Sequence, residues 1–431
     1  MEKFIVQGGH PLEGRIRVQG AKNAALPMMA AVLLADDGPL VLRNVPRLRD
    51  IDSMGAILES LGVSVVRRGD RLVMEIVDET LFTASYELVS MMRASFCVLG
   101  PLLGRRRRAK VSLPGGCVIG VRPVDLHLKG LRALGADVSV ENGYVVAEAP
   151  RLRGNQIFLG GPFGSTVTGT ANVLMAAVRA KGTTIIDYAA CEPEVQDLCV
   201  LLNKMGAKIS GIGSPRLVIE GVESMHGTEH TVLPDRIEAG TFIAAAAVCG
   251  GDLVVDPVRP DHLGAVIETL KQIGVDIHVG ANSVRVRGKR RYGAADLTTL
   301  PYPGFPTDLQ AQIMTVLTLS DGISVIQEKI YPDRFMHVAE LCRLGANIRK
   351  EGSSAIVLGV EALHGAQVMA SDLRASAALL VAGLGAEGST EIRRVYHIDR
   401  GYDRVEERLN AVGARVERVV DQKVRMMEDA A

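Results

Sequence analysis

Alternating apolar and polar residues recur along the chain, and each run comes after the same local sequence. An apolar helix end, a glycine and a small or β-branched residue precede the run six times, at intervals of roughly 70 residues. The six copies are Leu61-Gly62-Val63, Leu134-Gly135-Ala136, Met205-Gly206-Ala207, Ile273-Gly274-Val275, Leu344-Gly345-Ala346 and Val412-Gly413-Ala414. A glycine directly after an apolar helix end is typical of a helix C-cap. We therefore predict six helix ends, each leading into a strand.

Residues 137–146, directly after the second of these helix ends, illustrate the alternation. Its period is two, which is typical of a strand, and Asn142-Gly143 lies in its middle. Because Asn-Gly is a preferred sequence for a two-residue hairpin turn, this segment predicts a β-hairpin.

A second recurring segment is rich in small apolar residues on all sides. Examples are residues 21–27, 242–248 and 375–382, and such segments end near a glycine that opens another strand. A helix with small apolar residues all round is expected to be buried inside sheets. Each repeat of roughly 70 residues then contains two helices and about four strands.

Six repeats divide most simply into three plus three, which predicts an α/β fold with two similar lobes and a cleft between them. We expect the chain to cross between lobes near Gln19-Gly20 and near 230–233. The first lobe then comprises residues 22–232, and the second comprises residues 1–21 and 233–431, so that both chain ends join one lobe. Repetition predicts a shape but not a function.

Composition narrows the possible functions of this 431-residue chain. It has 49 basic and 49 acidic side chains, 4% aromatic residues and no tryptophan, which disfavours nucleic-acid binding. Arg105 to Arg108 form the one basic run, which we interpret as a solvated turn, the alternative being a polyanion patch. The N-terminus lacks a secretory signal and no apolar run is long enough to span a bilayer, so we expect a cytosolic protein.

Familiar cofactor motifs are missing from the sequence. It contains no Walker loop, no strand-linked G-x-G-x-x-G, no H-E-x-x-H and no Cys-x-x-Cys, so neither a cofactor nor a metal is implied. The six cysteines are expected to be reduced thiols.

One cysteine differs from the others in its surroundings. Cys117 comes after Pro114-Gly115-Gly116, so we expect it on an exposed, movable loop with a functional role. Cys191 stands beside acidic residues that disfavour its thiolate. The remaining four lie in apolar helical stretches and are predicted to be buried hydrophobic residues: Cys97, Cys199, Cys249 and Cys342.

Cationic residues fall at corresponding helix starts or loops of different repeats. They are Lys22 (with Asn23 next to it), Arg93, Arg334, Arg374 and Arg400. Acidic residues are interleaved with them: Asp50, Asp125, Asp235, Asp308, Asp372 and Asp399. Guanidinium groups and helix N-termini bind phosphate and carboxylate. The set therefore suits a ligand with several anionic groups beside a hydroxyl that needs a base. For Asp308, which comes after Pro306-Thr307, an ordinary helix N-cap is the alternative.

Longer motifs carry a resemblance to a known family. They are Gly20-Ala21-Lys22-Asn23-Ala24-Ala25-Leu26-Pro27, Met92-Arg93-Ala94-Ser95, Leu113-Pro114-Gly115-Gly116-Cys117, Arg122-Pro123-Val124-Asp125-Leu126-His127, Leu233-Pro234-Asp235-Arg236-Ile237-Glu238, Phe305-Pro306-Thr307-Asp308, Arg334-Phe335-Met336-His337 and Tyr396-His397-Ile398-Asp399-Arg400-Gly401-Tyr402. In this order, and over essentially the whole chain, the sequence resembles the UDP-N-acetylglucosamine enolpyruvyl transferases of the enolpyruvyl transferase family.

The resemblance implies two inside-out α/β barrel lobes, each of three βαβαββ repeats, that close around phosphoenolpyruvate and UDP-N-acetylglucosamine. The implied reaction transfers the enolpyruvyl group to the sugar 3-hydroxyl by addition and elimination and releases phosphate. It is the first committed step of peptidoglycan precursor synthesis. It needs no cofactor, and we expect no nucleic-acid or membrane partner and a monomer or weak oligomer.

The resemblance also implies site residues. Cys117 would be the acid that protonates C3 of phosphoenolpyruvate, and Asp308 the base toward the sugar hydroxyl. The full catalytic set is Cys117, Asp308, Lys22 and Arg400. Phosphoenolpyruvate would contact Lys22, Asn23, Arg122 and Arg400. The sugar nucleotide would contact Arg93, Arg122, Pro123, Val124, Asp125, Leu126, Thr166, Val167, Asp308 and Ile330. Cleft support would come from Asp50, Arg334, Asp372 and Arg374.

Two departures from the family pattern leave alternatives open. Arg49 stands where many relatives have lysine, and Thr166-Val167-Thr168 replaces the usual Ser-Val-Gly. A paralogue that only binds the sugar nucleotide is one alternative. Enolpyruvyl transfer to shikimate 3-phosphate is another, although that enzyme lacks the Pro-Gly-Gly-Cys loop. A nucleic-acid-binding ring using Arg105 to Arg108 is a third and would show a steep salt dependence.

Overall fold

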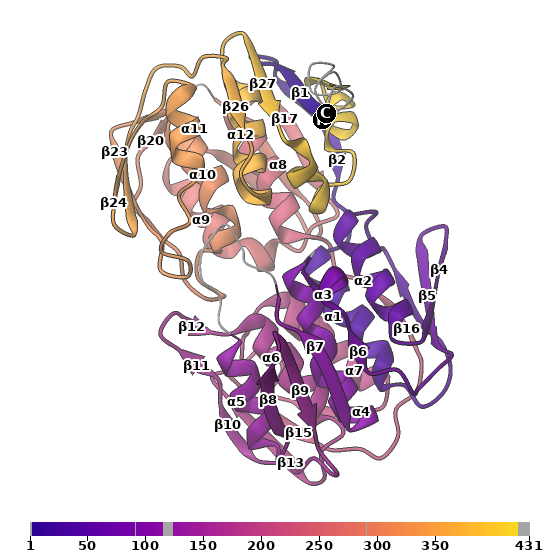
Figure 1. Ribbon diagram of the computed structural model, residues 1–431. Coiled ribbons are helices and arrows are strands. Elements are labelled where there is room, and N and C mark those ends of the chain that lie inside the picture. Colours follow the sequence, from indigo (N-terminus) through magenta and orange to yellow (C-terminus); the bar gives the residue numbers. More distant parts are fainter. Residues whose placement is uncertain (1, 91, 115–123, 290, 421–431) are drawn as a thin grey trace. The chain divides into compact units, whose positions relative to one another are not determined.

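The computed structural model describes residues 2–90, 92–114, 124–289 and 291–420, which divide into two compact units (Figure 1). Unit 1 contains residues 2–19 and 234–420, and unit 2 contains 20–114 and 124–233. Ala21 and Leu233 both lie in unit 2, where the Ala21 N–H donates to the Leu233 carbonyl at 2.8 Å. Each unit has its own hydrophobic core.

Three four-stranded sheets with one common strand order form the frame of unit 2. In each, the first two strands are parallel and the remaining neighbours are antiparallel. The first sheet is β16 (Glu229–Thr231), β3 (Leu40–Arg43), β5 (Arg71–Ile76) and β4 (Val63–Arg68). The second is β6 (Thr83–Ala84), β7 (Arg108–Ser112), β9 (Tyr144–Glu148) and β8 (Asp137–Glu141). The third is β10 (Gln156–Phe158), β13 (Thr183–Asp187), β15 (Arg216–Glu220) and β14 (Lys208–Ser210).

Unit 1 repeats this order in three further sheets. They are β2 (Leu12–Arg17), β17 (Gly251–Asp256), β19 (Val284–Gly288) and β18 (Asp276–Val279); β21 (Leu297–Thr298), β23 (Ile323–Gln327), β25 (Ser354–Leu358) and β24 (Asn347–Glu351); and β26 (Gln367–Met369), β27 (Ser389–Arg393), β1 (Glu2–Gln7) and β28 (Arg415–Val420). The N-terminal strands β1 and β2 complete two sheets of this unit, as expected for a closed repeat. Two short pairs are β11 (Gly160–Gly161) with β12 (Gly164–Ser165) and β20 (Tyr292–Gly293) with β22 (Ser320–Asp321).

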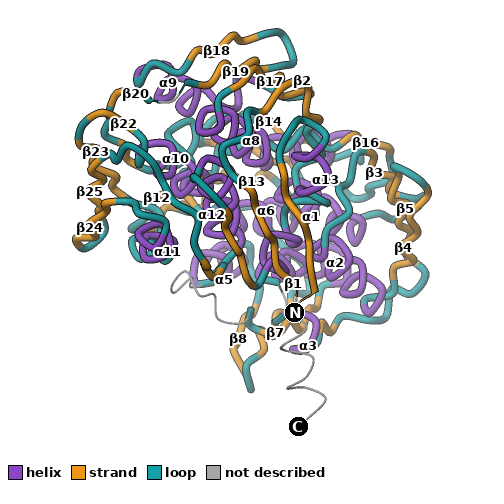
Figure 2. The backbone as a smooth tube through the Cα atoms, turned by 90° about the horizontal axis from the view of Figure 1, so that it is seen from above, coloured by secondary structure: helices purple, strands orange, loops and turns teal. Residues whose placement is uncertain are grey.

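One helix of each repeat is an inner helix, enclosed by the sheets. The inner helices are α1 (Lys22–Ala30), α4 (Leu99–Arg106), α6 (Val167–Ala177), α8 (Arg236–Cys249), α10 (Gln310–Leu317) and α12 (Leu373–Gly385). Every residue of α8 from 236 to 248 is buried, and so is all of α10. Figure 2 shows β18 and β23 lying outside the unit 1 helices α8, α10 and α12. The prediction of two inside-out α/β lobes of three repeats is confirmed.

The other helices expose one side to solvent. The outer helices are α2 (Arg49–Ser60), α5 (Asp125–Ala133), α7 (Pro193–Lys204), α9 (Gly264–Gln272), α11 (His337–Arg343) and α13 (Val405–Asn410). Short helices precede several elements: α3 (Tyr86–Val89) and the 3₁₀ segments η2 (Arg93–Val98), η3 (Pro260–Leu263), η4 (Thr307–Leu309) and η5 (Val395–Arg400), while η1 (Ala31–Leu34) continues α1.

The predicted helix ends are confirmed by their backbone angles. All six repeat glycines have positive φ, from 79° at Gly62 to 105° at Gly206 and Gly413, a region in which a Cβ is strained. The Asn142-Gly143 turn between β8 and β9 also has positive φ at both residues, 51° and 80°, as a type I′ hairpin requires.

The basic run differs from the solvated turn that the sequence suggested. Arg105 forms ion pairs with Asp36 at 3.0 Å and Glu79 at 2.8 Å. Arg106 donates to the Leu61 carbonyl at 2.8 Å, so both side chains tie the end of α4 to neighbouring loops. Only Arg107 and Arg108 are exposed. The interpretation as a wholly solvated turn is therefore wrong, because acidic and carbonyl oxygens lie within reach of the first two arginines.

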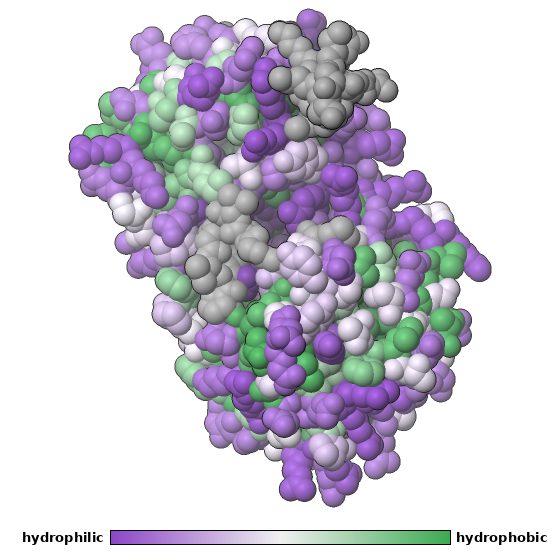
Figure 3. Space-filling view, viewed as in Figure 1, coloured by the Kyte–Doolittle hydropathy of each residue, from purple (hydrophilic) through white to green (hydrophobic). Residues whose placement is uncertain are grey.

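On the face drawn in Figure 3, hydrophobic residues form patches separated by hydrophilic ones. Large exposed hydrophobic residues occur in both units, among them Val77 and Tyr86 of unit 2 and Ile323 of unit 1. Within the part of the chain that the structure describes, no helix combines the length and the apolar character needed to cross a membrane.

Candidate active site

Asp308 lies in η4 of unit 1, immediately before α10, and is held by two arginines. Arg334 Nη1 is 2.7 Å from Asp308 Oδ1, and Arg374 Nη2 is 2.8 Å from Oδ2. The arginine side chains are 8% and 6% exposed, whereas that of Asp308 is 25% exposed and so accessible from solvent. The side chain caps neither η4 nor α10, so the N-cap interpretation of Asp308 is wrong.

Charge controls the protonation of this cluster. Burial raises the pKa of Asp308, but the Arg374 and Arg334 guanidinium groups outweigh it and hold that pKa well below its usual range. Burial lowers the pKa of both arginines, and the Asp308 carboxylate more than restores it. All three groups are therefore charged at neutral pH.

A buried hydrogen-bond chain joins Arg374 to two other inner helices. Its Nη1 donates to the Tyr402 hydroxyl at 3.3 Å, and that hydroxyl lies 2.7 Å from Thr241 Oγ1 on α8. Gln312 Nε2 of α10 donates to the same Thr241 oxygen at 3.2 Å. Burial raises the pKa of Tyr402. The N-terminal halves of α8, α10 and α12 thus meet around Asp308 and Arg374.

The other unit 1 residues singled out from the sequence lie on neighbouring segments. Asp372 is the N-cap of α12, where its Oδ1 accepts N–H bonds from Arg374 at 2.9 Å and Ala375 at 3.1 Å. Arg400 ends η5 and is half-buried. A Cβ on the next residue, Gly401, would lie 2.7 Å from a Leu373 methyl, so η5 packs closely against the start of α12.

Lys22 and Asp50 form the charged part of the unit 2 site. Lys22 opens α1 and Asp50 lies in the first turn of α2, and Lys22 Nζ is 2.9 Å from Asp50 Oδ2. Their side chains are 10% and 5% exposed. The adjacent Asn23 is exposed, as is Arg49 beside Asp50. No side-chain hydrogen bond caps α1, so its first N–H groups are not covered by a cap of the kind that Asp372 provides.

The segments expected to contact the sugar nucleotide begin two other helices of unit 2. Val124 is the N-cap of α5, and Asp125 is its exposed first residue. Thr166 is the N-cap of α6, where its hydroxyl accepts the Gly169 N–H at 3.2 Å. Val167 is 37% exposed. The threonine at 166 therefore caps the helix with the same kind of hydroxyl that the usual serine offers.

A neutral histidine network lies beneath these helix starts, and sequence reasoning missed it. Asn172 Oδ1 accepts the Gly100 N–H, which leaves its Nδ2 to face His127 Nδ1 at 3.0 Å. Nδ1 is then the acceptor and Nε2 carries the proton, which faces Thr168 Oγ1 at 3.3 Å. Burial, and then the charge of Arg93 on η2, lower the pKa of His127 to about 3. His127 is therefore neutral, and the extra hydroxyl of Thr168 is bonded to it.

Three residues of the sequence-based site, Cys117, Arg122 and Pro123, lie outside the described residues. Of the other cysteines, Cys97 and Cys199 are buried as predicted, whereas Cys249 at the end of α8 is only partly buried. Burial raises the pKa of all three to about 12. Burial and Glu192 also raise the pKa of Cys191, as the sequence suggested.

Cys342 is exposed, so its predicted burial is wrong. The preceding Leu341 already points into the core, and one step along a helix turns the next side chain about 100° away.

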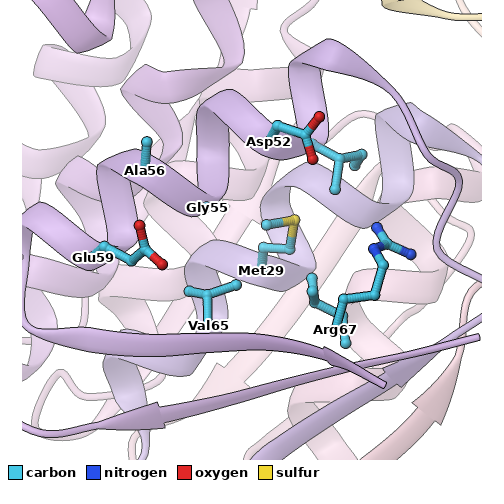
Figure 4. A pocket seen from close by; sticks show the side chains of 9 residues that line it. Met29, Asp52, Gly55, Ala56, Glu59, Val65 and Arg67 are labelled. Atoms are coloured by element: carbon cyan, nitrogen blue, oxygen red, sulfur yellow. The ribbon is translucent and has the colours of Figure 1, made fainter. Parts of the chain in front are cut away.

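A pocket of about 220 Å³ in unit 2 lies apart from these residues (Figure 4). Asp52 and Glu59 of α2 face Val65 and Arg67 of β4 across it, with Met29 between them. No residue that the sequence assigned to the site lines it. We therefore do not assign it to the active site.

Comparison with known proteins identifies the family. Residues 6–409 match the family model for EPSP synthase (3-phosphoshikimate 1-carboxyvinyltransferase). A protein of Methylacidiphilum infernorum (isolate V4) is 53% identical over 421 residues, covering 97% of this chain and 99% of its own. One of Koribacter versatilis (strain Ellin345) is 52% identical over 423 residues, covering 97% of both. Both are named UDP-N-acetylglucosamine 1-carboxyvinyltransferase.

Solved structures agree with this result. The enolpyruvyl transferase NikO from Streptomyces tendae has a TM-score of 0.89 at 25% identity and covers 97% of this chain and 99% of its own. EPSP synthase from Acinetobacter baumannii has a TM-score of 0.75 at 18% identity, over 97% of this chain and 100% of its own, and supports the fold alone. The repeats, the full-length match and these relatives together place the chain in the EPSP synthase family of enolpyruvyl transferases, to which it belongs.

Proposed function

We propose that this protein transfers the enolpyruvyl group of phosphoenolpyruvate to the 3-hydroxyl of UDP-N-acetylglucosamine and releases phosphate. The observation that carries the proposal is the 53% identity, over nearly the full length of both chains, to a relative named for this activity. The chemistry of the described residues supports it, because both units hold buried cations together with carboxylates.

The reaction has two steps that balance without a cofactor. The sugar 3-oxygen attacks C2 of phosphoenolpyruvate while a proton is added to C3 and the hydroxyl proton is lost, which gives a tetrahedral phosphate ketal. Loss of a proton from C3 then restores the double bond as the C2–O bond to phosphate breaks. Negative charge builds on the departing phosphate, so fixed cations near it lower the barrier.

We assign the phosphate and carboxylate of phosphoenolpyruvate to Lys22, Asn23, Arg122 and Arg400, with Arg93 nearby. Lys22 supports this role because it opens α1, whose N-terminus favours an anion, and because Asp50 orients its ammonium group at 2.9 Å. Cys117 is assigned as the acid at C3.

Asp308 is assigned to the sugar hydroxyl. As an anion that is partly exposed, it is ready to accept a hydrogen bond from that hydroxyl. Its low pKa makes it a weak base while both arginines are bound to it. Binding of an anionic substrate near Arg334 or Arg374 would offset their charge, raise the Asp308 pKa and allow proton transfer.

The sugar nucleotide is assigned to the helix starts that carry exposed or half-buried residues. At the start of α5 they are Val124, Asp125 and Leu126, and at the start of α6 they are Thr166 and Val167. We also assign Ile330, which follows β23, and Pro123, which lies outside the described residues. A Cβ on Gly161 would lie 3.2 Å from Leu126 Cδ1, so Leu126 packs against the β11–β12 hairpin that leads into α6. This contact brings the 126 and 166 segments of unit 2 together.

Phosphate release on mixing the two substrates tests the reaction. We expect release that requires both phosphoenolpyruvate and UDP-N-acetylglucosamine, and none when shikimate 3-phosphate replaces the sugar nucleotide. Release with phosphoenolpyruvate and shikimate 3-phosphate, but not with the sugar nucleotide, would contradict the proposal and favour the activity for which the family model is named. Binding of the sugar nucleotide without release would support a non-catalytic paralogue.

Covalent labelling tests Cys117. A phosphonate epoxide such as fosfomycin should inactivate the protein irreversibly, faster with UDP-N-acetylglucosamine bound, and peptide mapping should place the adduct on Cys117 alone. Cys342→Ser is the matched control, since Cys342 is exposed but on an outer helix. Cys117→Asp should keep some turnover and lose labelling, whereas Cys117→Ser should lose more turnover. An adduct on Cys191 or Cys342 would refute the assignment.

We further propose a cytoplasmic location, since both substrates are intracellular metabolites, and a monomer or weak oligomer. Cell fractionation tests the first, and light scattering at two protein concentrations tests the second.

A further inference from the structure

Glu328 is a buried carboxylate next to the Asp308 cluster. No sequence motif indicated a role for it. It lies directly after β23 and is fully buried. Its Oε1 accepts hydrogen bonds from the Thr299 hydroxyl at 2.7 Å and from the N–H groups of Ile330 and Tyr331, both at 2.9 Å. Its Oε2 accepts one from the Thr307 hydroxyl at 2.9 Å. These four donors are uncharged, and together they satisfy a carboxylate that would otherwise be costly to bury.

The bond to Thr307 sets the direction of one proton. A hydroxyl has a single hydrogen, and Thr307 uses it toward Glu328. Its oxygen is then free to accept Arg334 Nη1 at 3.0 Å, and the same nitrogen reaches Asp308 Oδ1 at 2.7 Å. Because Glu328 takes the hydroxyl hydrogen of Thr307, the Thr307 oxygen is an acceptor for Arg334 Nη1, the same nitrogen that binds Asp308.

The bonds to the backbone fix the segment that carries the arginine. Glu328 holds the N–H groups of residues 330 and 331, and the carbonyl of Tyr331 accepts the Arg334 N–H at 2.8 Å. One carboxylate thus connects the 307–308 segment with the 330–334 turn. The distance between Asp308 and Arg334 depends on both.

We propose that Glu328 is a positioning residue for Asp308: it aligns Thr307 and the 330–334 turn so that Arg334 clamps the Asp308 carboxylate. The effect of this clamp on turnover rests on the proposed function of Asp308. Its effect on the ionisation of Asp308 does not.

Replacement of Glu328 by glutamine reverses the direction of its hydrogen bond with Thr307. Oε1 accepts three donors, so the amide oxygen of Glu328→Gln stays there and the amide nitrogen takes the place of Oε2. The nitrogen then donates to Thr307, whose hydrogen must turn toward Arg334, itself a donor. Arg334 is pushed from Asp308. Thr307→Val removes the acceptor for Arg334 while leaving the 330–331 bonds intact.

The experiment compares Glu328→Gln, Thr307→Val and Thr307→Ser with Thr318→Val. Thr318 is the matched control, because it is buried in the same unit and its hydroxyl donates only to a helix carbonyl, that of Thr315, at 2.7 Å. Carbon-13 NMR of labelled aspartate gives the Asp308 pKa, and phosphate release gives kcat and KM across pH.

We expect the Asp308 pKa to rise by about one unit in Glu328→Gln and Thr307→Val, as one guanidinium withdraws. We expect kcat to fall roughly 10- to 100-fold through loss of orientation. Thr307→Val should leave the KM for the sugar nucleotide within about twofold of the parent, since the 330–331 bonds remain. Thr307→Ser should restore kcat, and Thr318→Val should change only the melting temperature.

A lowered melting temperature with unchanged kcat, pH profile and Asp308 titration in Thr307→Val would overturn the proposal and leave Glu328 a structural residue. If Glu328→Gln does not fold, Thr307→Val and its serine rescue carry the test. If the parent releases no phosphate, the proposed function fails, and the Asp308 titration still decides whether Glu328 positions Asp308.

Discussion

The inner helices of the two units begin differently, although the repeats are alike. In unit 1, α8 and α12 start with Asp235 and Asp372, and each carboxylate accepts two backbone N–H groups. In unit 2, α6 starts with the neutral Thr166, which accepts one N–H, and α1 has no side-chain cap. The remaining inner helix of each unit, α4 and α10, also has no side-chain cap and continues directly from a 3₁₀ segment. Since a helix N-terminus attracts anions, unit 1 has filled two of these positions with its own carboxylates. In unit 2, the start of α1 has no such carboxylate cap.

The charged clusters show the same division. Unit 1 ties Asp308 to two arginines that are nearly buried, so its anion is fixed before any substrate binds. Unit 2 presents a cation, Lys22, that is oriented by one carboxylate, and it also contains the neutral His127. The same repeat thus carries the carboxylate that we propose for the sugar hydroxyl in one unit and the proposed anion site in the other, because function depends on the residues at the helix starts and not on the fold.

The largest expected effect separates the two carboxylates. Asp308→Asn removes the group assigned to the sugar hydroxyl and should lower kcat roughly 10²- to 10⁴-fold. Asp50→Asn leaves the charge of Lys22 in place and should cost roughly 10-fold, through orientation alone. Phosphate release measures both. Equal losses would mean that the units do not differ in this way.

Asparagine is a sharper test of Asp308 than alanine. Alanine would leave the Arg334 and Arg374 guanidinium groups close together and buried without the carboxylate, so we expect Asp308→Ala to lower the melting point as well as turnover. Asparagine keeps one acceptor oxygen for them. Near-normal turnover of Asp308→Asn with a lowered melting point would return Asp308 to a structural role.

A second effect lies in the acid sensitivity of the two units. Burial lowers the pKa of His127 in unit 2 to about 3 and that of His337 in unit 1 to about 4. Each is neutral when folded but takes up a proton near pH 6.5 when unfolded. Stability is therefore fully present above pH 6.5 and falls as the pH drops toward 3 for His127 and toward 4 for His337.

Between pH 7 and pH 5 each histidine should account for about 2 kcal/mol of lost unfolding free energy. In His127→Gln and His337→Gln, the loss of unfolding free energy between pH 7 and pH 5 should be smaller by that amount. Urea unfolding at the two pH values measures it. A variant that loses as much stability as the parent would show that its histidine is protonated in the fold.

Helix capping gives a third, smaller difference. Asp235→Ala removes two N–H bonds of 2.8 and 3.1 Å and should cost about 1 to 2 kcal/mol, whereas Thr166→Ala removes one of 3.2 Å and should cost about 0.5 kcal/mol. Urea unfolding at low salt measures both. A larger cost at Thr166 would contradict the view that unit 2 leaves its helix starts weakly capped.

The smallest effect concerns glycines outside both clusters. A Cβ on Gly55, inside α2 beside the pocket of Figure 4, would meet only a Val65 methyl at 3.7 Å, so Gly55→Ala should stabilise unit 2 by about 0.5 to 1 kcal/mol. Gly264, the first residue of α9 in unit 1, also has open space around it. Gly264→Ala should raise the stability less than Gly55→Ala, because the N–H of a first helical residue has no partner within the helix. Turnover should not change in either variant. Destabilisation by Gly55→Ala would show that the pocket closes in solution.

Much of the fold could be read from local sequence because its signals are local. The positive φ of the repeat glycines, the Asn142-Gly143 turn and the burial of the alanine-rich helices each depend on a few neighbouring residues. The same signals recur in all six repeats, which makes the repeat recognisable. Local sequence is therefore sufficient for the repeat, the layers and the residue types at the helix starts.

The partners of those residues depend on tertiary packing. Asp308 meets Arg374, 66 residues away, and Glu328 meets Thr307, 21 residues away. His127 meets Asn172 on a different helix, and Arg105 pairs with Asp36 across two elements. Hydrogen bonds and ion pairs form between atoms within about 3 Å, and that proximity depends on how distant segments pack. A sequence pattern specifies which groups are available, whereas the fold specifies which of them meet and hence which carry charge.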